Sequence, residues 1–137
     1  MSQLSFDGKT GTLLLSRRAW LCVNNALNEV CHGFRVTNFS MRIGVSREEA
    51  ARLLDTVHAE GQRVWGEEVW SDSSLAVGSA RIKLALDEML GIRNAISETL
   101  RELGVEEFET RVGVPFEDGQ VILAKLDEFL RAMDDTT

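Results

Sequence analysis

The chain uses one short motif twice. Residues 38–45 read NFSMRIGV and residues 106–114 read EEFETRVGV, so the pattern Phe-x-x-Arg-(Ile/Val)-Gly-Val begins at Phe39 and again at Phe108, 69 positions later. Self-similarity at a fixed spacing predicts a fold assembled from copies of one structural unit. This repeat restricts the architecture more than any other feature of the sequence.

The match extends well beyond the motif. When the chain is shifted by 69 residues without a gap, twelve positions between residues 12 and 57 are identical to their counterparts. In the first copy these are Leu15, Leu21, Asn25, Ala26, Glu29, Val36, Phe39, Arg42, Gly44, Val45, Glu48 and Leu54. We interpret the 137 residues as one compact domain built by tandem duplication with pseudo-twofold symmetry. Residues 1–62 would form repeat one, 72–133 repeat two, and 63–71 a connector.

Each repeat is expected to contain a β-hairpin followed by two helices. QLSF and TLLLS flank Asp7-Gly8-Lys9-Thr10-Gly11, and glycines at such a position predict a hairpin turn. Ser16 has the side chain of a helix N-cap, and Gly33 is a typical helix end. The apolar spacing between them predicts the first helix.

The second helix of repeat one is expected after a loop over residues 34–44, which is rich in β-branched and turn residues. A Ser-x-x-Glu capping box at Ser46 predicts its start, and Gly61 is the expected end. The connector is expected to be extended and to pack Trp65 and Trp70 between the repeats.

The second repeat is expected to follow the same plan, with SLAV at residues 74–77 and ARIKLAL at 80–86 as its hairpin. Residues 80–86 also suit the start of a long helix, but their equivalent, TLLLS, precedes an N-cap residue, so we favour a strand. A helix over 87–103, a loop around Phe108 and a helix over 116–133 complete an α+β fold with four main helices and a small antiparallel sheet.

The charge balance narrows the possible partners. The net charge is −7 and the sequence pI is about 4.8, which argues against nucleic acid and anionic membranes as partners. No apolar stretch approaches the roughly 18 residues of a membrane span, and the N-terminus does not read as a secretory signal. We therefore expect a cytoplasmic protein.

The sequence suggests neither a metal site nor a catalytic site. Cys22, Cys31, His32 and His58 would match zinc in number, but the two cysteines lie nine residues apart, on opposite faces of the expected helix. No ligand recurs at the corresponding positions of the second repeat. Because no catalytic or cofactor motif is legible, we expect a protein that is not an enzyme and has no cofactor.

Six polar residues recur as two equivalent sets. Asparagine and glutamate lie four residues apart on the first helix of each repeat, and an arginine lies in the motif: Asn25, Glu29 and Arg42, then Asn94, Glu98 and Arg111. An arginine beside buried apolar residues needs acceptors, which this asparagine and glutamate can supply. One interpretation is an internal network that ties loop to helix in each repeat. The other is a pair of symmetry-related sites that bind a partner or ligand.

The acidic excess lies in the second half. Residues 1–75 contain 8 basic and 9 acidic side chains, whereas residues 76–137 contain 7 and 13. Glu106, Glu107 and Glu109 are candidate contacts for a basic protein. We therefore expect a protein-binding protein that neutralises a basic partner, as immunity proteins and antitoxins do.

The alternative is a small-ligand or regulatory module that binds an anion with Arg42 and Arg111 in the cleft between the repeats. The sequence is also compatible with a homodimer.

Overall fold

The structure, a computed structural model, describes residues 3–7, 10–70 and 78–135. The strands in these residues are β1 (Gln3–Asp7), β2 (Thr10–Leu15) and β3 (Ala80–Leu84). The helices are α1 (Arg17–Asn28), the π-helical turn η1 (Glu29–Gly33), α2 (Phe39–Ile43), α3 (Arg47–Trp65), the 3-10 helix η2 (Gly66–Trp70), α4 (Leu86–Val112) and α5 (Phe116–Asp135). The predicted α+β class is confirmed.

The sheet is antiparallel with the order β1-β2-β3. The predicted hairpin between β1 and β2 is confirmed, and β2 also pairs with β3, with Leu13 directly opposite Ile82. The preference for a strand over a helix is confirmed for Ala80–Leu84, although Leu86 already begins α4. The predicted strand at residues 74–77 lies outside the described residues.

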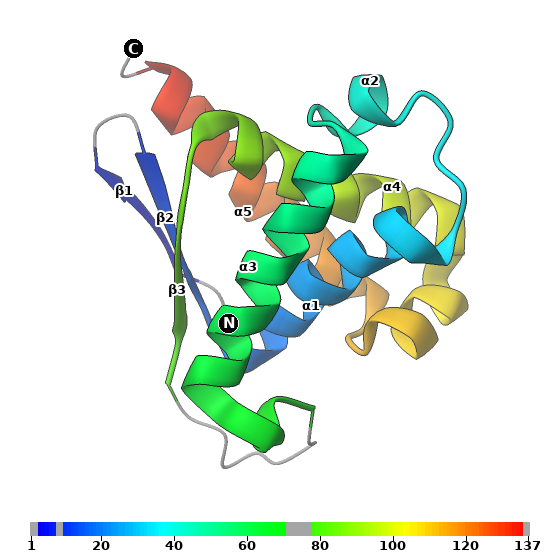
Figure 1. The fold of residues 1–137 in the computed structure, drawn as a ribbon, viewed down its shortest axis with the longest axis horizontal. Helices are drawn as coiled ribbons and strands as arrows, with labels where there is room; N and C mark the ends of the chain where they lie inside the picture. Colours follow the sequence, from blue (N-terminus) through cyan, green and yellow to red (C-terminus); the bar gives the residue numbers. More distant parts are fainter. Residues whose placement is uncertain (1–2, 8–9, 71–77, 136–137) are drawn as a thin grey trace.

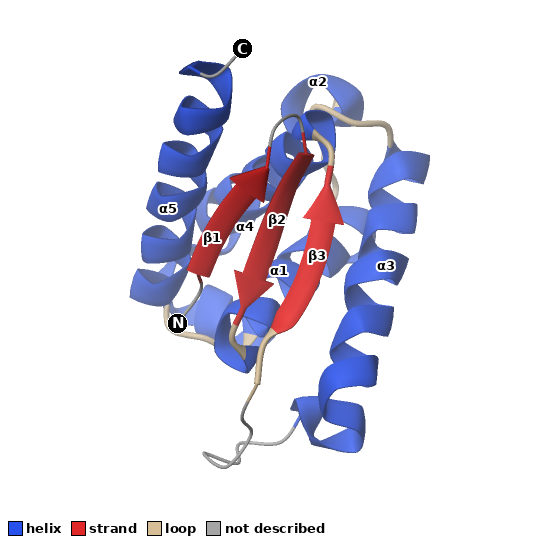
Figure 2. Ribbon diagram, turned by 90° about the vertical axis from the view of Figure 1, so that its left-hand side faces the viewer, coloured by secondary structure: helices blue, strands red, loops and turns tan. Residues whose placement is uncertain are grey.

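The helices pack on one face of the sheet. In Figure 1 the sheet lies to one side of the helices, and Figure 2 shows α1 and α4 behind it, with α3 and α5 along its two edges. Alternate residues of β2 and β3 point into this layer, including the fully buried Leu13 and Leu84. They join Trp20 of α1 and Ile92 of α4 in one hydrophobic cluster, so both halves of the sequence share a core.

The predicted helix starts are confirmed. The Ser16 hydroxyl accepts a hydrogen bond from the Ala19 amide at 3.2 Å, and Ser46 forms the capping box with Glu49. Helical structure after α1 continues through η1 to Gly33, the predicted end. The predicted end at Gly61 is wrong.

Gly61 lies inside α3, which continues to Trp65. The glycine is buried against Trp20, where an added Cβ would lie 2.3 Å from the indole ring. It permits close packing of α3 on α1 and does not end the helix.

The two predicted motif loops are wrong in part, because each contains a helical turn. Phe39–Ile43 forms α2, and residues 105–112 continue α4 beyond a break at Gly104, where φ is 74° and ψ is −176°. Phe39 and Phe108 are buried, as expected of core anchors. Each is followed four residues later by a buried aliphatic residue, so one helical turn places both on the same face.

The predicted extended connector is also wrong where the structure describes it. Residues 63–65 belong to α3, and η2 follows directly. The Trp65 and Trp70 rings lie 6.0 and 5.4 Å from the Trp20 ring, so these aromatic contacts are made in the first half of the chain and not between the halves.

Candidate functional site

Two asparagines join the halves of the chain. The Asn25 amide nitrogen on α1 donates to the Val112 carbonyl at 2.7 Å, and the Asn94 amide nitrogen on α4 donates to the Ile43 carbonyl at 2.8 Å. Residues 25 and 94 are 69 apart, as are 43 and 112. The two hydrogen bonds therefore join corresponding positions in opposite directions.

The glycine of the repeated motif has a conformational role in these contacts. Gly44 and Gly113 each end a helical turn with positive φ, 96° and 92°, a region that favours glycine. The carbonyl just before each glycine accepts the asparagine amide. The motif is therefore the helix end that presents this carbonyl to the other half.

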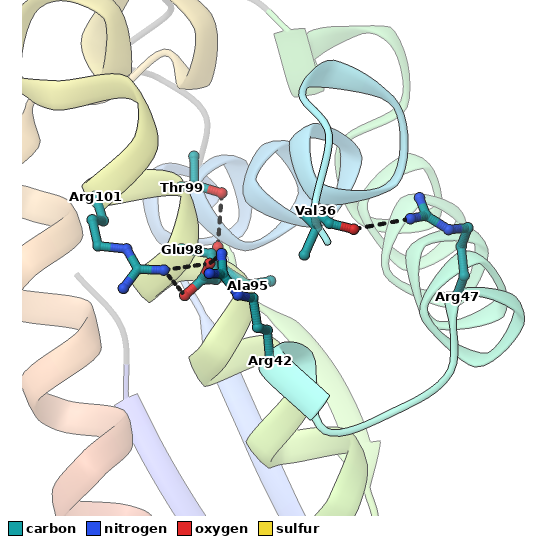
Figure 3. A network of polar contacts seen from close by, with 7 residues as sticks. All are labelled: Val36, Arg42, Arg47, Ala95, Glu98, Thr99 and Arg101. Atoms are coloured by element: carbon teal, nitrogen blue, oxygen red, sulfur yellow. Dashed lines mark hydrogen bonds and ion pairs between the residues drawn. The ribbon is translucent and has the colours of Figure 1, made fainter. Parts of the chain in front are cut away.

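The motif arginines pair with glutamates in the same crossed fashion. Arg42 lies 3.3 Å from Glu98, and Arg111 lies 2.6 Å from Glu29. Figure 3 shows Arg42 and Arg101 converging on the Glu98 carboxylate, Arg42 from α2 and Arg101 from α4. The Arg111 guanidinium also donates to the Gly33 carbonyl at 3.2 Å.

The structure pairs the predicted arginines and glutamates, but across the halves, and the predicted asparagines bind backbone carbonyls and not the arginines. The sequence interpretation tied loop to helix within each repeat, whereas each arginine contacts the glutamate of the other half. Glu29 and Glu98 have side chains only 8% and 15% exposed, so their charges need cationic partners. These contacts hold the halves together, and they engage both arginines.

The predicted acidic residues lie on the last turns of α4. Glu106, Glu107 and Glu109 are exposed, as are Glu102 before them and Glu117 in the first turn of α5. In the described part of the chain none of these five forms an ion pair. We call these five residues the acidic surface.

A hollow of about 400 Å³ lies between α3 and the edge strand β3 and is lined in part by Glu60, Arg63, Arg81 and Lys83. The Glu60 carboxylate accepts hydrogen bonds from the Arg63 guanidinium at 2.7 and 2.9 Å and from the Arg81 backbone amide at 2.9 Å. The bond from Arg63 is the main cause that lowers the pKa of Glu60. Glu60 thereby satisfies a donor on a free strand edge.

Burial favours the protonated form of both cysteine thiols. Burial raises the pKa of the Cys22 thiol to about 12, and burial also raises the pKa of Cys31. Among residues 3–7, 10–70 and 78–135 no group of three His, Cys, Asp or Glu side chains is placed to hold a metal ion. No helix in the same residues is long and apolar enough to cross a membrane.

Sequence reasoning missed an apolar groove between α4 and α5. Its lining includes Leu86, Leu90, Asp127, Leu130 and Arg131. The sequence predicts that Leu86 and Leu90 share one helical face, because they lie four residues apart. It does not predict that this face is exposed, because exposure depends on how α4 packs against the other elements.

Comparisons of the chain with protein-family models, with curated proteins and with solved structures found no match.

Proposed function

We propose that this chain is a non-enzymatic protein that binds a basic protein partner through the acidic surface. Neutralisation of that partner, as by an immunity protein or antitoxin, is the form of activity that the charge distribution favours. One observation supports it most directly. The five acidic residues of this surface form no ion pair with described residues, whereas the arginines near them do.

The cations near the acidic surface already have partners. Arg101 lies 2.8 Å from Glu98, Arg111 lies 2.6 Å from Glu29, and Arg18 pairs with Asp118. The five carboxylates of the acidic surface therefore keep their charge uncompensated by described neighbours. Exposed charges of one sign accelerate encounter with an oppositely charged protein and disfavour other partners.

The proposal includes the tandem duplication as the origin of the scaffold. Crossed hydrogen bonds and ion pairs at positions 69 apart support it, as do the nearly equal φ values of Gly44 and Gly113. The register of β2 on β3 agrees with a twofold axis, because Leu13 pairs with Ile82, its own counterpart. A duplicated scaffold leaves the second half free to acquire the acidic surface.

The alternative, an anion held by Arg42 and Arg111, is less favoured. Each arginine already contacts a largely buried glutamate, and an anion would have to displace Glu98 or Glu29 from its cation. Glu98 would keep Arg101 at 2.8 Å, but Glu29 would lose Arg111. A largely buried carboxylate left without its cation is destabilising by several kcal/mol, which would oppose binding at Arg111.

The experiment is an affinity capture from native lysate at low and raised salt, using three forms of the protein. The test variant reverses Glu106, Glu107 and Glu109 to Lys. The control variant reverses Asp55, Glu67 and Glu68, three exposed acidic residues of the first half, to Lys. Each variant changes the net charge from −7 to −1, because each reversal adds two charges.

We expect wild type and control to capture one stoichiometric basic protein that raised salt releases. With the captured protein purified, the test variant should bind it about tenfold to a hundredfold more weakly, since exposed charge pairs contribute about 0.2–1 kcal/mol each and reversal adds repulsion. Equal affinity of the test variant, or capture of no protein at low salt, would contradict the proposal.

A further inference from the structure

In the first half of the chain, η2 covers the groove between the start of α1 and the end of α3. The Arg17 guanidinium donates to the Val69 carbonyl at 3.1 Å. The Trp70 ring lies 5.4 Å from Trp20 and 5.9 Å from His58, and Val69 is fully buried. A short segment with an aliphatic and an aromatic residue thus closes this groove.

In the second half, the groove between the start of α4 and the end of α5 is open. It forms a hollow of about 390 Å³, within the range of small-ligand pockets, and its described lining is mainly apolar. Leu86 and Leu90 remain 45% and 40% exposed. We call this hollow the α4–α5 groove.

The two grooves occupy corresponding places. Leu86 lies 69 residues after Arg17, and Asp127 lies 69 residues after His58. Arg17 and His58 contact η2, whereas in the described part of the chain no segment takes the place of η2 over Leu86 and Asp127. The molecule itself therefore displays the kind of segment that fits such a groove.

We propose that the α4–α5 groove binds a short segment of a partner protein with the chemistry of Gly66–Trp70, namely acidic residues followed by an aliphatic and an aromatic residue. This inference depends on the correspondence of the halves that the proposed function includes, but not on the acidic surface. The aromatic ring lies against Leu86, Leu90 and Leu130, which lose exposed apolar area on binding.

One cation in the described lining can contact an acidic residue of the segment. Arg131 is exposed at its rim, while Asp127 is neutralised by Arg93 at 2.8 Å. Arg131 is therefore a cation of the described lining that can pair with an acidic residue of the segment. In a second copy of this chain the same segment is already engaged, since its Trp70, although 50% exposed, packs against Trp20 and His58.

The test is a titration of the full-length, isotope-labelled protein with the capped peptide GEEVW, followed by amide chemical shifts. We expect saturable shifts centred on Leu86, Leu90 and Leu130. The peptide GEEVA should bind at least about tenfold more weakly, since the aromatic ring supplies the largest apolar contact area of the segment.

Two variants make the test specific. Leu90→Lys should weaken binding at least about tenfold, because a lysine ammonium replaces apolar contact area. Val121→Lys on α5 introduces the same charge at a residue that is also 40% exposed but does not belong to the described groove lining, so it should bind as wild type does. Circular dichroism verifies that both variants are folded.

Several outcomes would overturn the inference: no saturable shifts, shifts centred elsewhere, equal binding of GEEVW and GEEVA, or unchanged binding by folded Leu90→Lys. Self-association of the wild type that Leu90→Lys abolishes would assign the groove to a second copy instead. The acidic-surface variant with Glu106, Glu107 and Glu109 reversed should bind GEEVW at least as well as wild type, so failure of one proposal is distinguishable from failure of the other.

Discussion

Substitution of Asn25 or Asn94 tests the crossed hydrogen bonds between the halves. Each amide donates to a carbonyl of the other half, next to buried aliphatic side chains. Asn25→Ala or Asn94→Ala leaves that carbonyl without its donor, which should lower the free energy of unfolding by about 1–3 kcal/mol. Urea unfolding measures the change.

The matched control for these variants is Asn28→Ala, which removes an exposed asparagine of the same helix as Asn25. Exposed substitutions away from specific contacts usually change stability by less than about 0.5 kcal/mol. If Asn25→Ala and Asn28→Ala are equally stable, the crossed hydrogen bond contributes nothing and the structural role of the motif is refuted.

At the same scale, Cys22 should be unreactive in the folded protein. With a pKa of about 12 in place of 9.0, its thiolate fraction at pH 8 is lower by about a thousandfold, and the thiolate is the reacting species. We expect a disulfide reagent to modify Cys22 only as fast as the protein unfolds, and promptly in denaturant. Rapid modification of Cys22 in the native protein, located by peptide mapping, would contradict its buried position.

The single residues show what the repeat pattern predicts and what it leaves open. The recurrence of asparagine, glutamate and arginine identified six residues that all make contacts between the halves. It did not reveal that Arg42 pairs with Glu98 and not with Glu29, because two identical sets of residues are compatible with pairing inside or across the halves. Three-dimensional packing alone decides between them.

At the scale of elements, Glu60 joins helix α3 to the edge strand β3. Its pKa is lowered in the folded protein, chiefly by Arg63, so its contribution to stability is present above the ordinary value of 4.5 and is lost as the pH falls through the folded pKa. Glu60→Gln should therefore be less stable than wild type at pH 7, with a difference that shrinks as the solution is acidified below about pH 4.5.

Urea unfolding of wild type and Glu60→Gln across this pH range measures the effect. A stability difference that stays constant with pH would indicate that the carboxylate charge of Glu60 is not stabilised by Arg63 and the Arg81 amide.

Elements with a local signal were predictable, and elements set by packing were not. Ser16 and Ser46 predict the starts of their helices, because an N-cap hydrogen bond joins residues that are close in the sequence. The single turn of α2 is too short to show helical periodicity, and it forms because Phe39 and Ile43 enter the core together. Gly61 resembles a helix end in the sequence, and only the Trp20 ring explains its place inside α3.

At the scale of the whole molecule, the halves should unfold as one unit. They share the hydrophobic core, the β2–β3 pairing and the crossed contacts. All three tryptophans lie in the first half, so their fluorescence reports on that half, whereas far-ultraviolet circular dichroism reports on both. We expect the two urea transitions to coincide, as two-state unfolding requires. A fluorescence transition at a different urea concentration would indicate halves that unfold separately.

The crossed contacts have a consequence for refolding at high protein concentration. The bonds from Asn25 to Val112 and from Asn94 to Ile43 are satisfied equally well when the two halves belong to different molecules. Exchange of halves between two chains preserves every one of these contacts and costs little beyond the entropy of association. Concentrated refolding should therefore yield a domain-swapped dimer that stays trapped after dilution, because its return to the monomer requires the shared core to open.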